Sequence, residues 1–244
     1  MKKYLPNLIT LMNLFCGCVA TVFAAAGQFE TATVLVCMGI AFDFFDGLAA
    51  RALKVKSELG LQLDSLADMV TSGLVPGIVM FRLLGGTWSG PGAEFYTETD
   101  TMHWIGIKIA PLALVGFLIT LASAYRLARF NIDARQTNSF IGLPTPANAL
   151  WIMSLPLITK YQAHIVPVEV ILNPWVLVVI TLCSAFLLNS EIELFALKSN
   201  NTKIFPYGFI ALALILLFSL HFLAVPIIIA LYIVSSMIMK ISTK

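Results

Sequence analysis

Apolar residues fill long runs of this sequence, and short polar segments separate the runs. A helix that crosses a membrane needs about 20 mostly apolar residues. The sequence therefore predicts eight helices, over residues 8–26, 31–50, 61–83, 104–125, 143–159, 170–188, 204–220 and 223–240. We expect an all-α fold, a polytopic transmembrane helical bundle in which residues 1–244 form one membrane domain. The glycine-rich segment 85–103 is expected to be a loop.

The composition agrees with a chain that lipid surrounds. Hydrophobic residues make up 59% of the 244 residues, charged residues make up 11%, and the mean hydropathy is +0.91. A soluble domain has about a quarter of its residues charged, so this chain has too few charges to cover a globular surface in water. The net charge of +2 gives no reason to expect nucleic acid as a partner. All four cysteines lie in apolar runs, which favours packing over disulfides or a zinc site.

Lysine and arginine predict the orientation of the helices. The N-terminal run is interrupted by Asn7, Thr10 and Asn13, and no clear cleavage site follows, so we interpret it as a retained first span. With both termini in the cytoplasm, twelve of the 15 basic residues lie on the cytoplasmic side and three (Arg82, Lys108 and Lys160) lie outside. Cytoplasmic segments of membrane proteins are enriched in these residues. We therefore expect eight spans in the cytoplasmic membrane, with both ends inside.

Four of the acidic residues gather around one predicted cytoplasmic turn. Asp43 and Asp46 lie at the end of the second predicted helix, and Asp64 and Asp68 lie at the start of the third. Residues three or four apart share a helical face, so each pair points in one direction. Helices joined by a short turn are neighbours, and the two faces can therefore meet around one cavity. Charged residues within membrane helices are costly and usually functional.

Four carboxylates this close together would repel one another unless protons or cations lie between them. Oxygen ligands suit Mg²⁺, Mn²⁺ or Ca²⁺, and the absence of histidine and cysteine nearby argues against zinc. Such a group can bridge two metal ions, an arrangement that recurs in phosphate chemistry. Gly47, Ala50 and Gly60 lie on the aspartate faces and leave room for a bulky group such as a nucleotide, although small residues also allow close helix packing.

The stretch Asp43-x2-Asp46-Gly47-x2-Ala50-Arg51-x8-Gly60-x3-Asp64-x3-Asp68 resembles the complete signature of the CDP-alcohol phosphotransferases. The resemblance implies that an alcohol attacks the lipid-linked phosphate of a CDP-activated donor and that CMP leaves. It implies two divalent ions, Mg²⁺ or Mn²⁺ with Ca²⁺ as a possible occupant, held by Asp43, Asp46 and Asp64. Asp68 would be a further ligand or the catalytic base. The remaining signature residues would contact the CDP group, namely Gly47, Ala50, Arg51 and Gly60.

The signature does not identify the acceptor alcohol, but segments 5–14, 122–131 and 140–146 resemble the phosphatidylserine synthases of that family. This resemblance covers about the first 150 residues and implies CDP-diacylglycerol and L-serine as substrates. It also makes 1–160 the catalytic core and 161–244 additional spans. Asn7, Thr10 and Asn13 lie at three-residue steps, and we interpret them as a polar stripe that faces the nucleotide, with Asn7 and Thr10 as CDP contacts. The alternative is that they cap the start of the helix.

Arg126 and Arg129 are three residues apart and can bind the acceptor together, or can simply anchor the fourth helix at the cytoplasmic side. Glycerol 3-phosphate or another phosphorylated alcohol would also suit two arginines, so the charges alone do not select serine. We expect a homodimer. A cation transporter is the rival of another class, but all four aspartates lie at one side and no acidic relay crosses the bundle.

Overall fold

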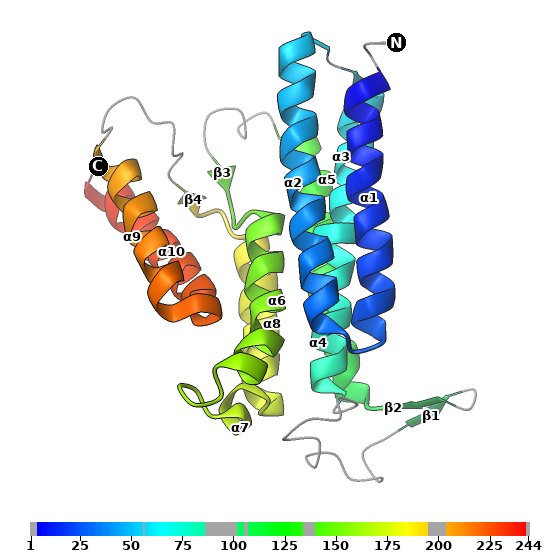
Figure 1. Cartoon of the computed structure of the whole chain (residues 1–244), viewed down its shortest axis with the longest axis vertical. Helices are drawn as coiled ribbons and strands as arrows, with labels where there is room; N and C mark the ends of the chain where they lie inside the picture. Colours follow the sequence, from blue (N-terminus) through cyan, green and yellow to red (C-terminus); the bar gives the residue numbers. More distant parts are fainter. Residues whose placement is uncertain are drawn as a thin grey trace.

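The computed structural model describes residues 4–55, 57–85, 102–104, 107–133, 140–194 and 204–242, and most of them are helical (Figure 1). The first half of the described chain contains α1 (Tyr4–Ala25), α2 (Phe29–Leu53), α3 (Glu58–Asp68), a π-helix (Met69–Leu74), α4 (Val75–Leu84), β1 (Met102–Trp104) and β2 (Ile107–Ile109). The second half contains a 3-10 helix (Pro111–Phe117), α5 (Leu118–Ile132), β3 (Phe140–Ile141), α6 (Thr145–Tyr161), α7 (Val168–Ile171), α8 (Pro174–Asn189), β4 (Glu193–Leu194), α9 (Ile204–Leu220), a 3-10 turn (His221–Leu223) and α10 (Ala224–Ser242).

Each of the eight predicted ranges contains an observed helix, but the predicted start of the fourth is wrong. Residues 102–104 and 107–109 pair as the antiparallel strands β1 and β2 rather than beginning a helix at 104. The helix begins instead at Pro111, whose fixed φ suits the first turn of a helix and whose missing N–H is not needed there. The predicted loop 85–103 lies largely outside the described residues.

Five helical segments of the described chain are long and apolar enough to cross a membrane. They are Tyr4–Ala25, Phe29–Leu53, Glu58–Leu84, Pro111–Ile132 and Gly208–Ile238. The last segment contains the reversal between α9 and α10 at His221, whose φ is +46°. The helices α6 and α8 are shorter, with 17 and 16 residues. The structure thus identifies a helical membrane protein, while the count of eight spans and the cytoplasmic placement of both termini stay predictions.

The outer surface of the bundle is rich in large apolar side chains, as expected for helices that face lipid. Phe218 is 83% exposed, Trp175 is 73% exposed and Phe186 is 69% exposed. Small residues face inward instead, and Ala20, Ala24 and Ala32 are fully buried where α1 packs along α2. Small side chains allow helix axes to approach closely in a membrane, which brings α1 against the aspartate-bearing helices.

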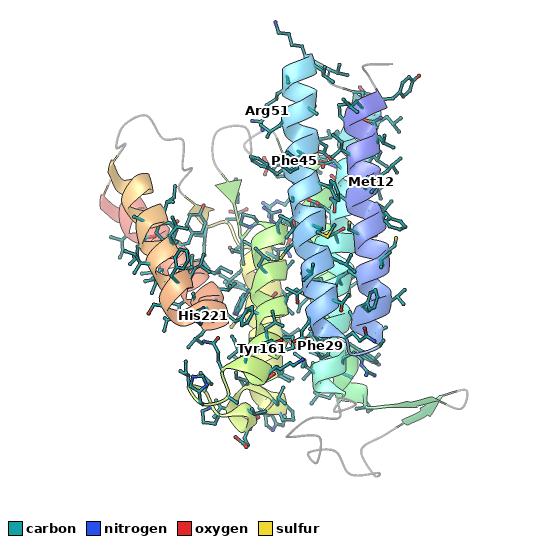
Figure 2. All side chains as sticks on the ribbon, viewed as in Figure 1. Met12, Phe29, Phe45, Arg51, Tyr161 and His221 are labelled. Carbon is teal, nitrogen blue, oxygen red and sulfur yellow. The ribbon has the colours of Figure 1, made fainter. Side chains whose placement is uncertain are left out.

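The last two helices form a hairpin beside the rest of the bundle (Figure 1). The buried side chain of Gln162, just after α6, holds the turn of this hairpin. Its Nε2 donates a hydrogen bond to the Leu220 carbonyl at 2.8 Å, and its Oε1 accepts one from the Leu223 N–H at 2.9 Å. The ring centroids of Tyr161 and Phe222 also lie 5.6 Å apart. Figure 2 shows Tyr161 and His221 at the end of the bundle opposite Arg51.

Candidate active site

Three of the four predicted aspartates converge between α2 and α3. Asp43, Asp46 and Asp64 each offer a carboxylate oxygen, and these oxygens lie within 4.8 Å of one another. Asp46 is buried, with 7% of its surface exposed, and the other two are partly buried. The prediction that the two pairs of aspartates face one another is therefore confirmed for these three residues.

The turn between the two helices explains why they meet. Helix α2 ends at Leu53. The next residue, Lys54, adopts a left-handed conformation with φ +54°, and its N–H donates to carbonyls of the last helical turn. Helix α3 then begins after Ser57, whose hydroxyl accepts a hydrogen bond from the N–H of Gly60 at 3.0 Å. With only a few residues between these two ends, α3 must run back along α2, which brings Asp64 level with Asp43 and Asp46.

Helix α1 contributes directly to the aspartate group. The hydroxyl of Thr10 lies 2.6 Å from Asp46 Oδ2 and 3.1 Å from the Pro6 carbonyl. A hydroxyl has one hydrogen, and the shorter contact to a charged acceptor is the stronger donor interaction. Thr10 therefore orients the carboxylate of Asp46, while its place in a stripe that faces the nucleotide stays a prediction.

A cavity of about 540 Å³ opens beside the aspartates. Five of the six residues predicted to contact CDP line it, namely Asn7, Thr10, Gly47, Ala50 and Gly60. The cavity has walls of Asp46 and Asp64 as well, so a molecule within it lies next to the carboxylates. Its volume is within the range of sites for small molecules, about 300–1,000 Å³.

Arg51 is the predicted CDP contact that does not line this cavity. Its Nε donates a hydrogen bond to the Gly47 carbonyl of its own helix at 3.0 Å. Sequence reasoning also missed several lining residues, namely Pro6 on α1 and Val55, Ser57, Glu58 and Leu61 around the turn between α2 and α3. The four residues around the turn are signalled in the sequence only by their position between the two pairs of aspartates.

Asp68 lies one helical turn beyond Asp64 and is outside the group of three oxygens. It is buried, and its Oδ1 accepts a hydrogen bond from Asn13 Nδ2 at 3.1 Å. Asp68 nevertheless interacts electrostatically with Asp64 and with the guanidinium of Arg126. The structure thus separates Asp68 from the other three aspartates by its partners, while keeping it close to them.

The two arginines of α5 have different surroundings. Arg126 is buried, interacts with Asp68, and its Nε has no hydrogen-bond partner among the described residues. Arg129 is partly exposed, and its Nη2 lies 2.8 Å from Glu191 Oε1. The structure therefore brings Arg126 to the aspartates and pairs Arg129 with an acidic residue that follows α8.

The group of three aspartates fits a divalent metal. Carboxylate oxygens are the ligands that Mg²⁺ and Mn²⁺ prefer. Asp64 Oδ1 is buried and accepts no hydrogen bond from the described residues, so this oxygen is free to coordinate a metal ion. Three ionised carboxylates with oxygens within 4.8 Å of one another would repel each other, and a bound cation would offset that repulsion.

Comparison with known proteins agrees with this chemistry. A family model described as CDP-alcohol phosphatidyltransferase matches residues 3–187. The chain is 31% identical over 144 residues to the CDP-diacylglycerol–serine O-phosphatidyltransferase of Bacillus subtilis (strain 168), which covers 59% of this chain and 70% of that protein.

Two further relatives give similar alignments. The CDP-diacylglycerol–serine O-phosphatidyltransferase of Helicobacter pylori (strain J99) is 31% identical over 160 residues, which covers 64% of this chain and 59% of that protein. The archaetidylserine synthase of Methanothermobacter thermautotrophicus is 29% identical over 161 residues, which covers 65% of this chain and 60% of that protein. The chain thus spans less than two thirds of the length of these two relatives.

Proposed function

The chain belongs to the CDP-alcohol phosphatidyltransferase family, and on that premise we propose that it transfers a phosphatidyl group from CDP-diacylglycerol to L-serine. The products would be phosphatidylserine and CMP. The family match confirms the resemblance seen in the signature from Asp43 to Asp68, and the names of the relatives support serine as the acceptor.

One observation carries this proposal. The cavity of about 540 Å³ is lined by signature residues and opens onto the carboxylates of Asp46 and Asp64. A nucleotide in the cavity would place its pyrophosphate beside the aspartates, with Gly47, Ala50 and Gly60 leaving space at the helix surfaces. Asn7 and Thr10 would face the same nucleotide from α1. Arg51, whose Nη2 would lie 4.0 Å from a β-carbon added at the cavity-lining Gly47, would reach the nucleotide by a change of its side-chain conformation.

In this proposal Asp43, Asp46 and Asp64 hold two divalent metal ions, Mg²⁺ or Mn²⁺. When bound, such ions neutralise the pyrophosphate and stabilise the negative charge on departing CMP. Thr10 keeps the Asp46 carboxylate in one orientation through its hydroxyl, so the ligand oxygens need little rearrangement.

Asp68 acts as the base in the proposed reaction. The serine hydroxyl gives its proton to the Asp68 carboxylate while its oxygen bonds to the phosphorus attached to diacylglycerol. The bond from that phosphorus to the bridging oxygen breaks, and CMP leaves with the electron pair. Arg126, which is buried and interacts electrostatically with Asp68, would bind the carboxylate of serine and hold the hydroxyl toward the base. Arg129 is the second proposed acceptor contact, although it must then share its charge with Glu191.

The lipid part of the donor would remain in the bilayer, next to the exposed apolar faces of the helices. We propose eight spans in the cytoplasmic membrane, with both termini and the aspartates on the cytoplasmic side, where CTP-derived donors and serine are available. A homodimer is part of the same proposal. Residues 1–160 would form the catalytic core, and the later helices would support it.

Purified protein incubated with CDP-diacylglycerol, Mn²⁺ and one alcohol at a time tests the proposal through CMP release. L-serine should release CMP fastest, and Asp43→Asn should abolish the release. Faster release with glycerol 3-phosphate would identify a sister enzyme of the same family. The absence of CMP release with every alcohol, combined with uptake of a radioactive cation into vesicles, would support a transporter instead.

A further inference from the structure

Asn13 lies on the buried face of α1 and has no exposed surface. Its Nδ2 donates a hydrogen bond to Asp68 Oδ1 at 3.1 Å, across the interface between α1 and α3. An amide that donates to a carboxylate forms a charge-assisted hydrogen bond, which is stronger than one between neutral groups. Asn13 is therefore the neutral donor that contacts the proposed base directly.

The chemistry of the contact fixes which way the amide points. Asn13 Oδ1 has no hydrogen-bond partner among the described residues, so exchanging the two amide atoms would gain nothing on that side. It would also turn the amide oxygen toward the oxygen of Asp68, where two acceptors would repel each other. The amide nitrogen therefore faces the carboxylate.

The Asn13 side chain is packed closely against neighbouring helices. A β-carbon added at Gly39 would lie 2.8 Å from Asn13 Oδ1 and 2.6 Å from Thr71 Cγ2. The hydroxyl of Thr71 also donates a hydrogen bond to the Asn13 carbonyl at 3.1 Å. The Asn13 side chain is thus packed against α2, and its backbone is hydrogen-bonded to the π-helix. The amide can therefore hold the Asp68 carboxylate in one orientation.

The π-helix that follows Asp68 gives a reason why its carboxylate needs to be held in place. It begins at Met69, directly after Asp68, and a π-turn changes the register of the residues that follow it. Thr120 of α5 donates a hydrogen bond to the Gly73 carbonyl within this turn at 3.1 Å. Asp68 therefore sits where the helix changes its geometry, and Asn13 ties its carboxylate to a different helix.

From this geometry we infer that Asn13 is a positioning residue, which holds one oxygen of Asp68 and leaves the other to accept the proton of the acceptor hydroxyl. This inference rests on the proposed role of Asp68 as the base. It assigns Asn13 an effect on turnover and none on the binding of the donor or the metal.

The first test replaces the amide. Asn13→Ala should lower kcat for CMP release about 10- to 100-fold, the usual effect of losing a group that orients a catalytic side chain. The KM for CDP-diacylglycerol, and Mn²⁺ binding measured by electron paramagnetic resonance without substrates, should each stay within about twofold. Cys16→Ala is the matched control, because Cys16 is also buried on α1 but contacts no aspartate by a hydrogen bond among the described residues. Asn13→Leu, of similar size, serves if Asn13→Ala does not fold.

A double-mutant cycle then separates positioning from packing. If Asn13 acts through Asp68, Asn13→Ala should cause no further loss of kcat in an Asp68→Asn background. Equal losses in both backgrounds, an unchanged kcat, or a parallel loss of Mn²⁺ binding would each overturn the inference while the wild-type protein remains active. A wild-type protein that releases no CMP with any alcohol would overturn the proposed function and, with it, this role of Asn13.

Discussion

Replacement of Gly47 by alanine should stabilise the fold and weaken donor binding at the same time. Gly47 lies within α2 and lines the cavity beside the aspartates. Apart from its own helix backbone and chain neighbours, the only described atom within 4 Å of a β-carbon added there would be Arg51 Nη2, at 4.0 Å. The protein itself therefore tolerates the extra methyl group, and only a molecule in the cavity would meet it.

The two effects can be estimated separately. Alanine is favoured over glycine in a helix interior by roughly 0.5–1 kcal/mol, so the melting temperature should rise slightly. An added methyl group in a closely packed site costs about 1–3 kcal/mol. Because about 1.4 kcal/mol corresponds to a tenfold change in affinity, the KM for CDP-diacylglycerol should rise about 5- to 140-fold.

The assay measures CMP release against donor concentration in mixed micelles, together with the thermal unfolding of the same preparations. Gly208→Ala is a matched control, because Gly208 is helical and an added β-carbon there has no atom of the described residues within 4 Å. It should raise stability without changing the KM. Gly60→Ala is a poorer probe, since its β-carbon would lie 2.9 Å from Ser57 Oγ.

An unchanged donor KM in a stable Gly47→Ala protein would refute this reasoning. The nucleotide would then have to bind away from Gly47, and the cavity would lose its assigned role. A loss of stability would instead show that the space around Gly47 is filled by protein.

Three further outcomes are expected. Asp64→Asn should abolish metal-dependent CMP release and lower Mn²⁺ binding while the protein still inserts, and normal turnover at saturating metal would remove it from the site. Arg126→Ala should raise the KM for serine at least tenfold by loss of a charged hydrogen bond. Arg129→Ala should raise it less, because Arg129 is paired with Glu191. Equal effects of the two substitutions would contradict the proposal that the buried Arg126 is the stronger contact to serine. In a background without native cysteines, an impermeant thiol reagent should label Lys54→Cys only in inside-out vesicles and His164→Cys only in right-side-out vesicles, and the opposite pattern would reverse the proposed topology.

Local sequence patterns determined the helices and the aspartate faces. Runs of apolar residues predicted eight helical ranges because helix length and apolar content are properties of a single segment. Helical periodicity predicted that Asp43 and Asp46 share one face of their helix, and the short turn made the helix that carries Asp64 its neighbour. The start of the fourth helix was mispredicted because residues 104–110 are mostly apolar, and such residues suit either a helix or the strands β1 and β2, in which Trp104 and residues 107–109 lie.

Tertiary structure alone decided which residues of distant segments meet these aspartates. Thr10 and Asp46 are 36 positions apart, and Asn13 and Asp68 are 55 positions apart. These contacts depend on how α1 is rotated about its axis relative to α2 and α3. Close packing at small residues sets that rotation, and the periodicity of each separate helix does not determine it. The two arginines of α5 are a second example. Their spacing predicts only that both lie on the same side of the helix. The packing of α5 buries Arg126, which interacts electrostatically with Asp68, and places Arg129 next to Glu191.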